Sequence, residues 1–336
     1  MSAARKWGIL GTGKIARLMA RAVRAQGLEV VSVGSRSEKR GASFAMEFEV
    51  PRAYCRYEGV LADPEVELVY VATNHPSHVE LSVAALEAGK HVLCEKPMGM
   101  SAAQVGRVRE VARRSGRFCM EAYPFLFHPQ TAALLKLVGS GRIGEVRMVE
   151  ASFGYDAGPN PRNYLLKREL AGGSILDVGC YTTALVMLIA EAGGGRVERV
   201  VGAGAEWRDE VDTLSGCLFE LSPMGLASVA SAIGVWLANE VRIFGTQGTI
   251  VVHDPWLPGR NGAETRLTIA EQRGKSEELL FAGGMDVYER EVRGVGEVIC
   301  RGELEHSMMD LSASWRNAVL LDKWREVVGV RSEMAG

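Results

Sequence analysis

A strand, a glycine turn and the start of a helix follow one another within residues 7–16, and this order constrains the fold more than any other feature of the sequence. Gly11 allows a tight turn directly after the apolar strand, and Gly13 lets the backbone come close to a bound group. Ala16 is small enough for the helix to pack closely on the strand. The helix, expected at about residues 14–25, would point its free N–H groups at an anion. The motif therefore suits the pyrophosphate of a dinucleotide, although an ordinary strand-to-helix turn has the same appearance.

The end of the second predicted strand, within residues 29–37, indicates which dinucleotide would bind. An NAD site normally has Asp or Glu at this strand end, where it accepts a hydrogen bond from the ribose 2′-hydroxyl. No carboxylate occupies the strand end here, and the side chains at and after it that can donate hydrogen bonds are Ser35, Arg36, Lys39 and Arg40. These donors favour the 2′-phosphate of NADP, with NAD as the second choice. The alternative is that Arg36 is a solvated loop residue and that Glu38 reaches back to the ribose.

Length and composition indicate a globular protein of two domains. The chain has 336 residues, of which 47% are apolar and 24% charged, and its net charge of −2 gives no general attraction for nucleic acid or anionic membranes. It begins without an apolar signal region, and no run of about 18 apolar residues suits a membrane span. We therefore expect a cytoplasmic location. The six cysteines and six histidines are scattered, so free buried thiols and no bound metal are expected.

The first 123 residues alternate between strand and helix signals. Strands are expected near residues 9–10, 30–33, 68–73, 91–94 and 118–122, with a helix at 77–88 that Gly89 would end. The run 66–73 is nearly all apolar, as in a strand buried on both faces of a sheet. This alternation is the βαβ pattern of a parallel sheet and predicts an α/β dinucleotide-binding domain over residues 1–123.

After Pro124 the sequence changes to segments that alternate or run apolar. The expected strands are residues 145–153, 197–207, 213–221, 226–233, 240–244 and 265–270. A mostly antiparallel sheet is the simplest interpretation, with helices at about 174–191 and 307–328. Residues 254–262 contain Pro255, Pro258 and Gly259 and are expected to form an exposed loop. The second domain is therefore assigned to residues 124–336, and its C-terminal helix could pack at the domain junction.

Two short segments contain residues that could do chemistry. Lys96 follows a predicted sheet strand at the edge where open α/β sheets bind their ligands, and Pro97 restricts its backbone. In the segment 172–181, a helix beginning near Ser174 would place Asp177 and Tyr181 four positions apart on one face. An ordinary capping box would also explain Ser174 and Asp177, and Tyr181 could be a half-buried core residue. An ammonium such as that of Lys96 would lower the pKa of a phenol toward the range useful for proton transfer.

Six motifs in order resemble those of the Gfo/Idh/MocA oxidoreductase family, and they span nearly the whole chain. They are the glycine turn, the segment 70–76, the Glu-Lys-Pro motif at 95–97, the segment 121–129, the segment 141–146 and the segment 172–181. The ending 321–325 resembles the dihydrodiol dehydrogenase and xylose dehydrogenase branch, which is also similar to glucose-fructose oxidoreductase. The resemblance implies an N-terminal Rossmann domain, then an α/β domain whose large, mostly antiparallel open sheet often forms a homodimer interface.

The resemblance also implies roles for individual residues. Lys96 would lie by the nicotinamide and the substrate hydroxyl, Tyr181 would be the acid/base, and Asp177 would complete the catalytic set. Residues of the glycine turn, the second strand end and the two following loops would bind the cofactor: Gly11, Thr12, Gly13, Lys14, Ile15, Ser35, Arg36, Lys39, Arg40, Thr73, Asn74, His75, Pro76, His78, Glu95 and Lys96. Residues expected to bind a small-molecule substrate are Tyr123, Leu126, Asn163, Leu165 and Tyr181.

Two departures from the family pattern bear on the substrate. Leu126 and Leu165 stand where related sugar dehydrogenases tend to have arginines. Burying unpaired hydroxyls against leucine would cost roughly 1–3 kcal/mol each, which favours a substrate less polar than a free sugar or sugar acid. The alternative is that Arg162, Lys167 or Arg168 fills the vacancy.

Three functions remain open from the sequence. The first is an NADP(H)-dependent oxidoreductase that acts on a sugar-like or cyclic alcohol or ketone, with Lys96 as the partner of Tyr181. The second is a catalytically inactive dinucleotide-binding regulator, although such relatives usually lose the lysine that is present here as Lys96. The third is an NAD-dependent glycosidase that oxidises its sugar transiently and returns the hydride.

Overall fold

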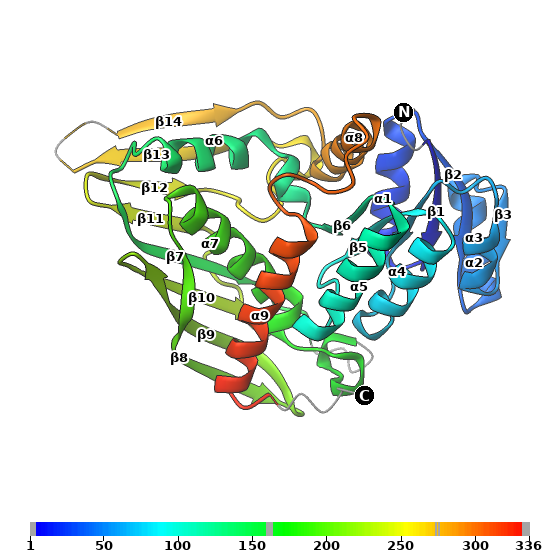
Figure 1. Ribbon diagram of the computed structural model, residues 1–336, viewed down its shortest axis with the longest axis horizontal. Coiled ribbons are helices and arrows are strands. Elements are labelled where there is room, and N and C mark those ends of the chain that lie inside the picture. The colour runs from blue at the N-terminus through cyan, green and yellow to red at the C-terminus, as the bar shows by residue number, and fades with distance from the viewer. Residues whose placement is uncertain (1–4, 159–163, 273, 275, 331–336) are drawn as a thin grey trace. The chain divides into compact units, whose positions relative to one another are not determined.

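The computed structural model of the chain describes residues 5–158, 164–272, 274 and 276–330. These residues divide into two compact units (Figure 1). Unit 1 contains residues 1–124 and 286–315, and unit 2 contains residues 125–285 and 316–336. The segment 286–315 therefore belongs with the N-terminal part of the chain, whereas the sequence alone assigned it to the second domain.

Unit 1 is built on a parallel six-stranded sheet. In order across the sheet, its described strands are β3 (Arg52–Tyr54), β2 (Glu29–Gly34), β1 (Lys6–Leu10), β4 (Leu68–Val71), β5 (His91–Glu95) and β6 (Cys119–Ala122). The helices of this unit are α1 (Lys14–Ala25), α2 (Glu38–Phe48), α3 (Tyr57–Ala62), α4 (His78–Glu87), α5 (Ala102–Ser115) and α8 (Val287–Cys300). The order 3-2-1-4-5-6 reverses between β1 and β4, and ligands of open α/β sheets bind at such a reversal.

Unit 2 is built on an eight-stranded mixed sheet. In order, its described strands are β14 (Ser276–Phe281), β13 (Thr265–Glu271), β12 (Gly248–Val252), β11 (Val241–Gly245), β7 (Val146–Gly154), β10 (Leu226–Ala232), β9 (Val211–Ser222) and β8 (Arg196–Arg208). Among the described strand pairs of this sheet, only β7–β10 is parallel. The expected α/β fold, a parallel sheet followed by a mostly antiparallel one, is confirmed.

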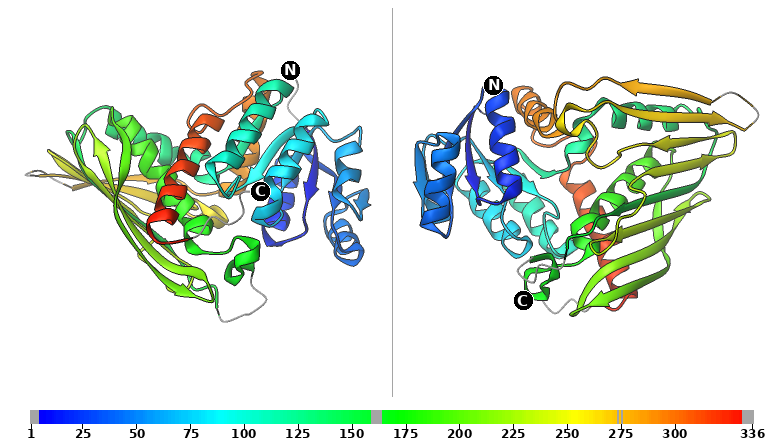
Figure 2. Two further views of the ribbon diagram at one scale, coloured as in Figure 1. Left: turned by 60° about the horizontal axis from the view of Figure 1, so that its bottom comes forward. Right: turned by 180° about the vertical axis from the view of Figure 1, so that it is seen from behind.

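The helices of unit 2 cover one face of its sheet, and Figure 2 shows no helix of the described chain on the opposite face. They are α6 (Pro129–Gly139), a π-helical turn η5 (Ile175–Gly179) that continues into α7 (Cys180–Ala192), and the C-terminal part of α9 (Leu311–Val327). Trp324 of α9 fixes this arrangement, since its indole N–H donates to Ser215 Oγ of β9 at 2.9 Å. Strand β9 alternates buried and half-buried residues, as expected where one face of the sheet is covered by helices.

One helical run, residues 168–192, is apolar and long enough to cross a membrane by length and composition, contrary to the expectation from the sequence. Its apolar window is entirely buried inside the structure, and the buried residues of α7 run from Cys180 to Ala190. A helix that is apolar all round suits the core of a protein as well as a membrane. In unit 2 the π turn η5 and helix α7, which make up most of this run, are buried in the core.

The segment 254–262 was expected to be an exposed loop, but only Asp254, Arg260 and Asn261 are exposed and its middle is buried. Trp256 is only 3% exposed, stacks on Phe153 with ring centroids 5.4 Å apart, and donates its indole N–H to Ser152 O at 2.9 Å. Pro255, Pro258 and Gly259 are buried with it. Glycine and proline specify the turns of this segment, but the large aromatic side chain decides where it packs.

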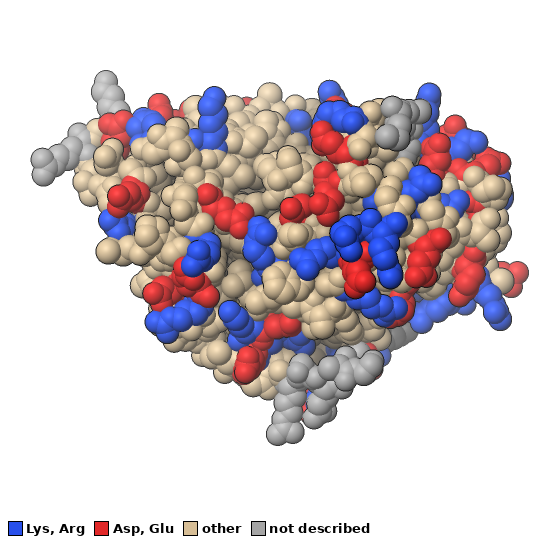
Figure 3. Space-filling model, viewed as in Figure 1, with Lys and Arg blue, Asp and Glu red and all other residues tan. Residues whose placement is uncertain are grey.

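Charges of both signs are distributed over the molecular surface. Figure 3 shows Lys and Arg interspersed with Asp and Glu on the face that it draws. Many of these side chains form exposed ion pairs, such as Arg107 with Glu80 and Arg142 with Glu271. The pattern agrees with the net charge of −2.

Candidate active site

The glycine turn after β1 has the geometry of a phosphate cradle. Gly11 has φ +109°, and a Cβ at this position would overlap the carbonyl oxygen of Ala72. Gly13 is the N-cap residue of α1, and a Cβ built there meets no atom within 4 Å. Open space therefore lies directly in front of the first N–H groups of α1, which has Lys14 rather than an acid at its start. These features fit the pyrophosphate of a dinucleotide.

Thr12 and Ile15 are half-buried on either side of this opening, and Lys14 is exposed. At the end of β2, Ser35 is buried, and its hydroxyl accepts a hydrogen bond from the Ser37 N–H at 3.2 Å. Ser37 in turn caps α2 by accepting from the Arg40 N–H. The side chains of Arg36, Lys39 and Arg40 are exposed, as is Glu38 in the first turn of α2.

The loops after β4 and β5 are joined through His78. Its Nδ1 lies 2.9 Å from Pro97 O, and its Nε2 lies 3.0 Å from Thr73 O. Burial lowers the pKa of the His78 imidazole. Both ring nitrogens of this predicted cofactor residue thus lie within hydrogen-bond distance of backbone carbonyls, one in each loop, so His78 links the two loops.

The other residues of the loop after β4 form a short 3-10 turn, η1 (His75–Ser77), that begins after Asn74 and includes Pro76. Ser77 Oγ donates to Thr73 Oγ1 at 2.7 Å, and His75 is buried. The loop is therefore fixed at the carboxyl end of β4, beside the reversal in strand order.

Lys96 directly follows β5 and is half-buried, and its peptide bond to Pro97 is cis. Glu95 accepts a hydrogen bond from the Tyr70 hydroxyl. The loop beyond Lys96 is held by Glu121, whose Oε1 accepts from the Met98 N–H at 2.8 Å. Burial raises the pKa of the Glu121 carboxyl, and the Met98 hydrogen bond and the Lys96 charge oppose this shift.

The segment with Asp177 and Tyr181 lies in unit 2, where the helix starts with a π turn. The capping box is wrong, because Ser174 Oγ donates to Asp212 Oδ2 at 2.8 Å and makes no cap bond to its own helix. Asp177 is 4% exposed, and its Oδ2 accepts from the Tyr155 hydroxyl at 2.5 Å. Single π turns inside α-helices are frequent at functional sites.

Three aromatic rings surround Tyr181, which is 6% exposed. Its ring centroid lies 6.0 Å from Phe125, 5.4 Å from Phe153 and 6.4 Å from Trp256. The Phe153 and Trp256 contacts are edge-to-face, a favourable geometry for aromatic pairs. The phenol therefore belongs to an aromatic cluster that sequence reasoning missed.

The residues predicted to bind substrate are mostly buried. Tyr123 is completely buried, and its hydroxyl donates to Glu121 Oε1 at 3.3 Å. Leu126 is 1% exposed, and Leu165 packs in a small hydrophobic cluster with Val211. Asn163 lies outside the described residues.

The missed residues of this site are Phe125, Phe153, Tyr155, Asp212 and Trp256. Phe153 and Tyr155 lie at and beyond the end of a correctly predicted strand, so their position gave a weak signal. Trp256 is a large aromatic within a turn-rich segment, which is unusual for a solvated loop. For Asp212 we find no signal, because a short charged run at 208–212 is typical of an exposed turn.

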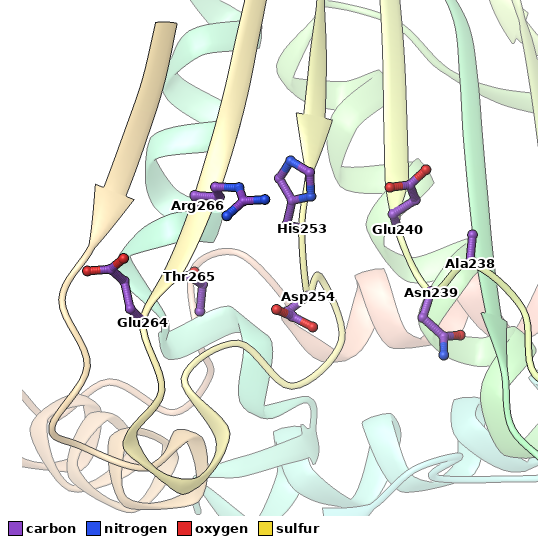
Figure 4. Close-up of a pocket in the computed structure, with 8 residues that line it drawn as sticks. All are labelled: Ala238, Asn239, Glu240, His253, Asp254, Glu264, Thr265 and Arg266. Atoms are coloured by element: carbon purple, nitrogen blue, oxygen red, sulfur yellow. The ribbon is translucent and has the colours of Figure 1, made fainter.

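A separate polar hollow of about 400 Å³ lies at strand ends of the unit 2 sheet (Figure 4). Glu240 just before β11, His253 just after β12 and Arg266 of β13 lie in a row, with Asp254 below them in the view. None of the lining residues is a predicted site residue. Among the described residues, no group of three or more His, Cys, Asp or Glu could hold a metal.

The parallel sheet, the glycine cradle and the lysine after β5 define unit 1 as a dinucleotide-binding fold, the kind that serves nicotinamide-dependent oxidoreductases. Residues 5–123 match the GFO/IDH/MocA oxidoreductase family with an NAD-binding Rossmann fold, and residues 131–251 match the GFO/IDH/MocA C-terminal domain. The chain belongs to the Gfo/Idh/MocA oxidoreductase family, and its relatives are named dehydrogenases and ketoreductases.

Relatives match over nearly their whole length. The chain is 32% identical to trans-1,2-dihydrobenzene-1,2-diol dehydrogenase of Sus scrofa and 33% identical to that of Danio rerio, in each case over 97% of both chains. Among solved structures, KijD10, a 3-ketoreductase from Actinomadura kijaniata in complex with NADP and TDP-benzene, is similar with a TM-score of 0.86 and 26% identity, over 96% of this chain and 97% of that one. A levoglucosan dehydrogenase shares the fold, with a TM-score of 0.83 and 18% identity over 96% and 97% of the two chains.

Proposed function

We propose that the protein is an NADP(H)-dependent oxidoreductase that interconverts a cyclic or sugar-like alcohol and its ketone. The observation that carries this proposal is the buried Tyr181 beside Asp177, enclosed by aromatic rings, in a chain whose other unit has a dinucleotide cradle. Tyr181 is the general acid/base, and Lys96 is its electrostatic partner. A lysine and a tyrosine of KijD10 have each been replaced in solved structures, which directs attention to the same two residue types.

The residues of unit 1 fit a bound dinucleotide. The N–H groups at the start of α1, with Gly11 and Gly13, would hold the pyrophosphate, and Arg36 with Lys39 and Arg40 would hold the 2′-phosphate of NADP. Glu95 and the loop 73–76 would hold the nicotinamide half. When bound, the nicotinamide supplies or accepts the hydride.

Tyr181 would donate its proton to the carbonyl oxygen in the reductive direction and remove the hydroxyl proton in the oxidative direction. A phenol with its ordinary pKa of about 10 is a poor acid/base near neutrality. A nearby ammonium stabilises the phenolate and also the developing alkoxide, so Lys96 would help in both directions. Asp177, fixed by Tyr155, would orient the helical turn from which Tyr181 projects.

The aromatic cluster and the two buried leucines support a substrate with an apolar ring. Phe125, Phe153 and Trp256 present hydrocarbon around the phenol, and Leu126 replaces a cation of the related sugar dehydrogenases. Arg168, one of the cations that could fill this vacancy, pairs with Glu210 at 2.9 Å. Several relatives are named for a cyclic diol, trans-1,2-dihydrobenzene-1,2-diol. We therefore propose cyclic alcohols, diols or ketones with an apolar ring as the substrate class.

A panel of alcohols and ketones, followed by cofactor absorbance, tests this substrate class. We expect kcat/KM for cyclohexanediol-like or aryl substrates to exceed that for free hexoses and sugar acids by about 10-fold or more, because each unpaired buried hydroxyl costs roughly 1–3 kcal/mol. Selectivity for anionic or polyhydroxylated sugars would contradict the apolar pocket. Release of a sugar without net change in absorbance would instead indicate the glycosidase, and absence of turnover with cofactor binding retained would indicate the regulator.

Replacing Arg36 by alanine tests the cofactor preference. The loss of a charge-assisted hydrogen bond to the 2′-phosphate should raise KM for NADP by about 10-fold or more and leave KM for NAD nearly unchanged. Glu38→Gln is the matched control in the same turn, and it should change neither value. If Glu38→Gln weakens NAD binding while Arg36→Ala has no effect, Glu38 binds the ribose and the preference is for NAD.

We further propose a cytoplasmic homodimer. The face of the unit 2 sheet that carries no helix supports association through this sheet, since a large uncovered sheet face is suited to an interface. Sedimentation of the purified protein would measure its oligomeric state.

A further inference from the structure

The helical turn with Asp177 and Tyr181 is held at its start by a carboxylate from a distant part of the chain. Asp212, the second residue of β9, is 4% exposed. Its Oδ2 accepts two hydrogen bonds at 2.8 Å, one from the Ser174 hydroxyl and one from the Ile175 N–H. Asp212 therefore accepts a hydrogen bond from a backbone N–H at the start of this helix, as an N-cap residue does, although it lies 37 positions away in the sequence.

The neighbouring backbone is shaped to admit this carboxylate. Gly173 has φ +121°, and a Cβ there would overlap Asp212 Oδ1. Ser174 Oγ also lies 2.9 Å from Ser231 Oγ of β10, so the turn is tied to two adjacent strands. The Gly173 carbonyl accepts the N–H of Asp177 at 3.1 Å, which connects the held turn directly to the residue beside Tyr155.

We propose, on the basis of the function given above, that Asp212 is a positioning residue that sets the placement of Asp177 and Tyr181 for proton transfer. The carboxylate fixes the N–H of Ile175 at the first residue of the π turn, and Tyr181 follows within the next two helical turns. A displacement of the turn by about 1 Å would misplace the phenol and cost up to about 100-fold in rate. Because its carboxylate accepts from Ser174 and Ile175 at the start of the turn, Asp212 is assigned a positioning role and not a catalytic one.

The charge of Asp212 is sensitive to pH in a useful range. Burial raises the pKa of its carboxyl to about 6, against the hydrogen bonds from Ile175 and Ser174 and the charge of Arg325 on α9, which lower it. Arg325 is half-buried and lies 3.8 Å from Asp322 of the same helix. On β10, Ser231 lies 2.9 Å from Ser174, the serine that donates to the Asp212 carboxylate. As the pH falls through about 6, the Asp212 carboxylate is protonated. The neutral acid is a weaker acceptor for the Ser174 hydroxyl and the Ile175 N–H, so these two hydrogen bonds weaken at acid pH.

Two substitutions separate the charge of Asp212 from its shape. Asp212→Asn keeps one acceptor oxygen and cannot titrate, and Asp212→Ala removes the acceptor altogether. We expect kcat of the alanine variant to fall by about 10-fold to 100-fold while KM for NADP stays unchanged, because unit 1 is untouched. The asparagine variant should keep more activity than the alanine variant. Asp209→Asn, on the exposed turn just before β9, is the matched control and should behave as the wild type.

The pH profile of kcat distinguishes a positioning role of Asp212 from a purely structural one, because a purely structural role would not change this profile. In the wild type kcat should fall as the pH drops through about 6, and in Asp212→Asn this fall should be absent. An acid limb with the same midpoint in Asp212→Asn would overturn the proposal, as would an unchanged kcat in folded Asp212→Ala.

Hydrogen exchange measured on the intact protein keeps this test independent of the chemistry. Amides of residues 174–181 should exchange faster in Asp212→Ala than in the wild type or in Asp209→Asn, at a temperature where circular dichroism shows all three folded. If Tyr181→Phe retains full turnover, the proposed function fails while this exchange result still stands. If turnover depends on Tyr181 but the exchange of 174–181 is unchanged in Asp212→Ala, the positioning role fails alone.

Discussion

Replacing Tyr181 by phenylalanine is expected to lower kcat by about 10²-fold or more and to leave the dissociation constant for NADP nearly unchanged. General acid/base catalysis contributes about 10²–10⁴-fold, and phenylalanine keeps the ring contacts with Phe125, Phe153 and Trp256 while it removes the proton donor. Turnover followed by cofactor absorbance and binding followed by fluorescence measure the two quantities separately.

Lys96→Met should give a loss of similar size, because methionine has nearly the length of lysine without its charge. Tyr57→Phe, at a half-buried position of α3, and Lys136→Met, at an exposed position of α6, are the matched controls. Both should leave kcat within about twofold, because neither residue is assigned to the site. Full activity in both Tyr181→Phe and Lys96→Met would argue against their assigned roles.

The second large effect concerns the glycine cradle, where alanine at position 11 should destabilise unit 1 strongly. The positive φ of Gly11 costs a residue with a side chain about 1–3 kcal/mol, and the added methyl overlaps the Ala72 carbonyl on the adjacent strand connection. We expect unfolding at a clearly lower urea concentration than the wild type, followed by far-UV circular dichroism.

Gly13→Ala is the matched control for this prediction, two positions along the same turn. Its methyl group would project into open space, so stability should be kept, but it would stand where a phosphate must approach. NADP affinity should therefore fall by about 10-fold or more, a loss of roughly 1.4 kcal/mol. Equal stability of Gly11→Ala and Gly13→Ala would contradict the geometry of the cradle.

The local pattern of apolar residues predicted the sheet of unit 1 and most strands of unit 2, because the spacing of apolar residues reflects which faces of a strand are buried. The strands Leu68–Val71 and Val146–Gly154 appear close to where the sequence placed them. Three strands were missed. The short or polar strands Arg52–Tyr54 and Ser276–Phe281 are determined by neighbouring strands rather than by their own side chains. The strand Gly248–Val252 is apolar and was missed although its pattern carried a signal.

The places of Gly11 in the turn after β1 and of Lys96 directly after β5 were predicted, because there one segment supplies both the signal and the geometry. The site was not predicted where distant segments meet. Ser174 and Asp177 have the spacing of a capping box, but the Ser174 hydroxyl instead donates to the buried carboxylate of Asp212. Trp256 likewise overrides the turn residues around it by stacking on Phe153. Such pairings depend on tertiary structure and leave little trace in a single sequence.

The return of residues 286–315 to unit 1 determines how the chain can be divided. Helix α8 packs against α1, with Val292, Val295 and Ile299 buried and a hydrogen bond from Gln26 to Glu289. A fragment that ends at residue 124 would contain the entire glycine cradle but would lack α8. The apolar surface of α1 that α8 covers would then be exposed, so the fragment would tend to aggregate. A soluble cofactor-binding fragment would need residues 286–315 joined to residues 1–124. Unit 1 can therefore be transferred to another protein only if both segments are included.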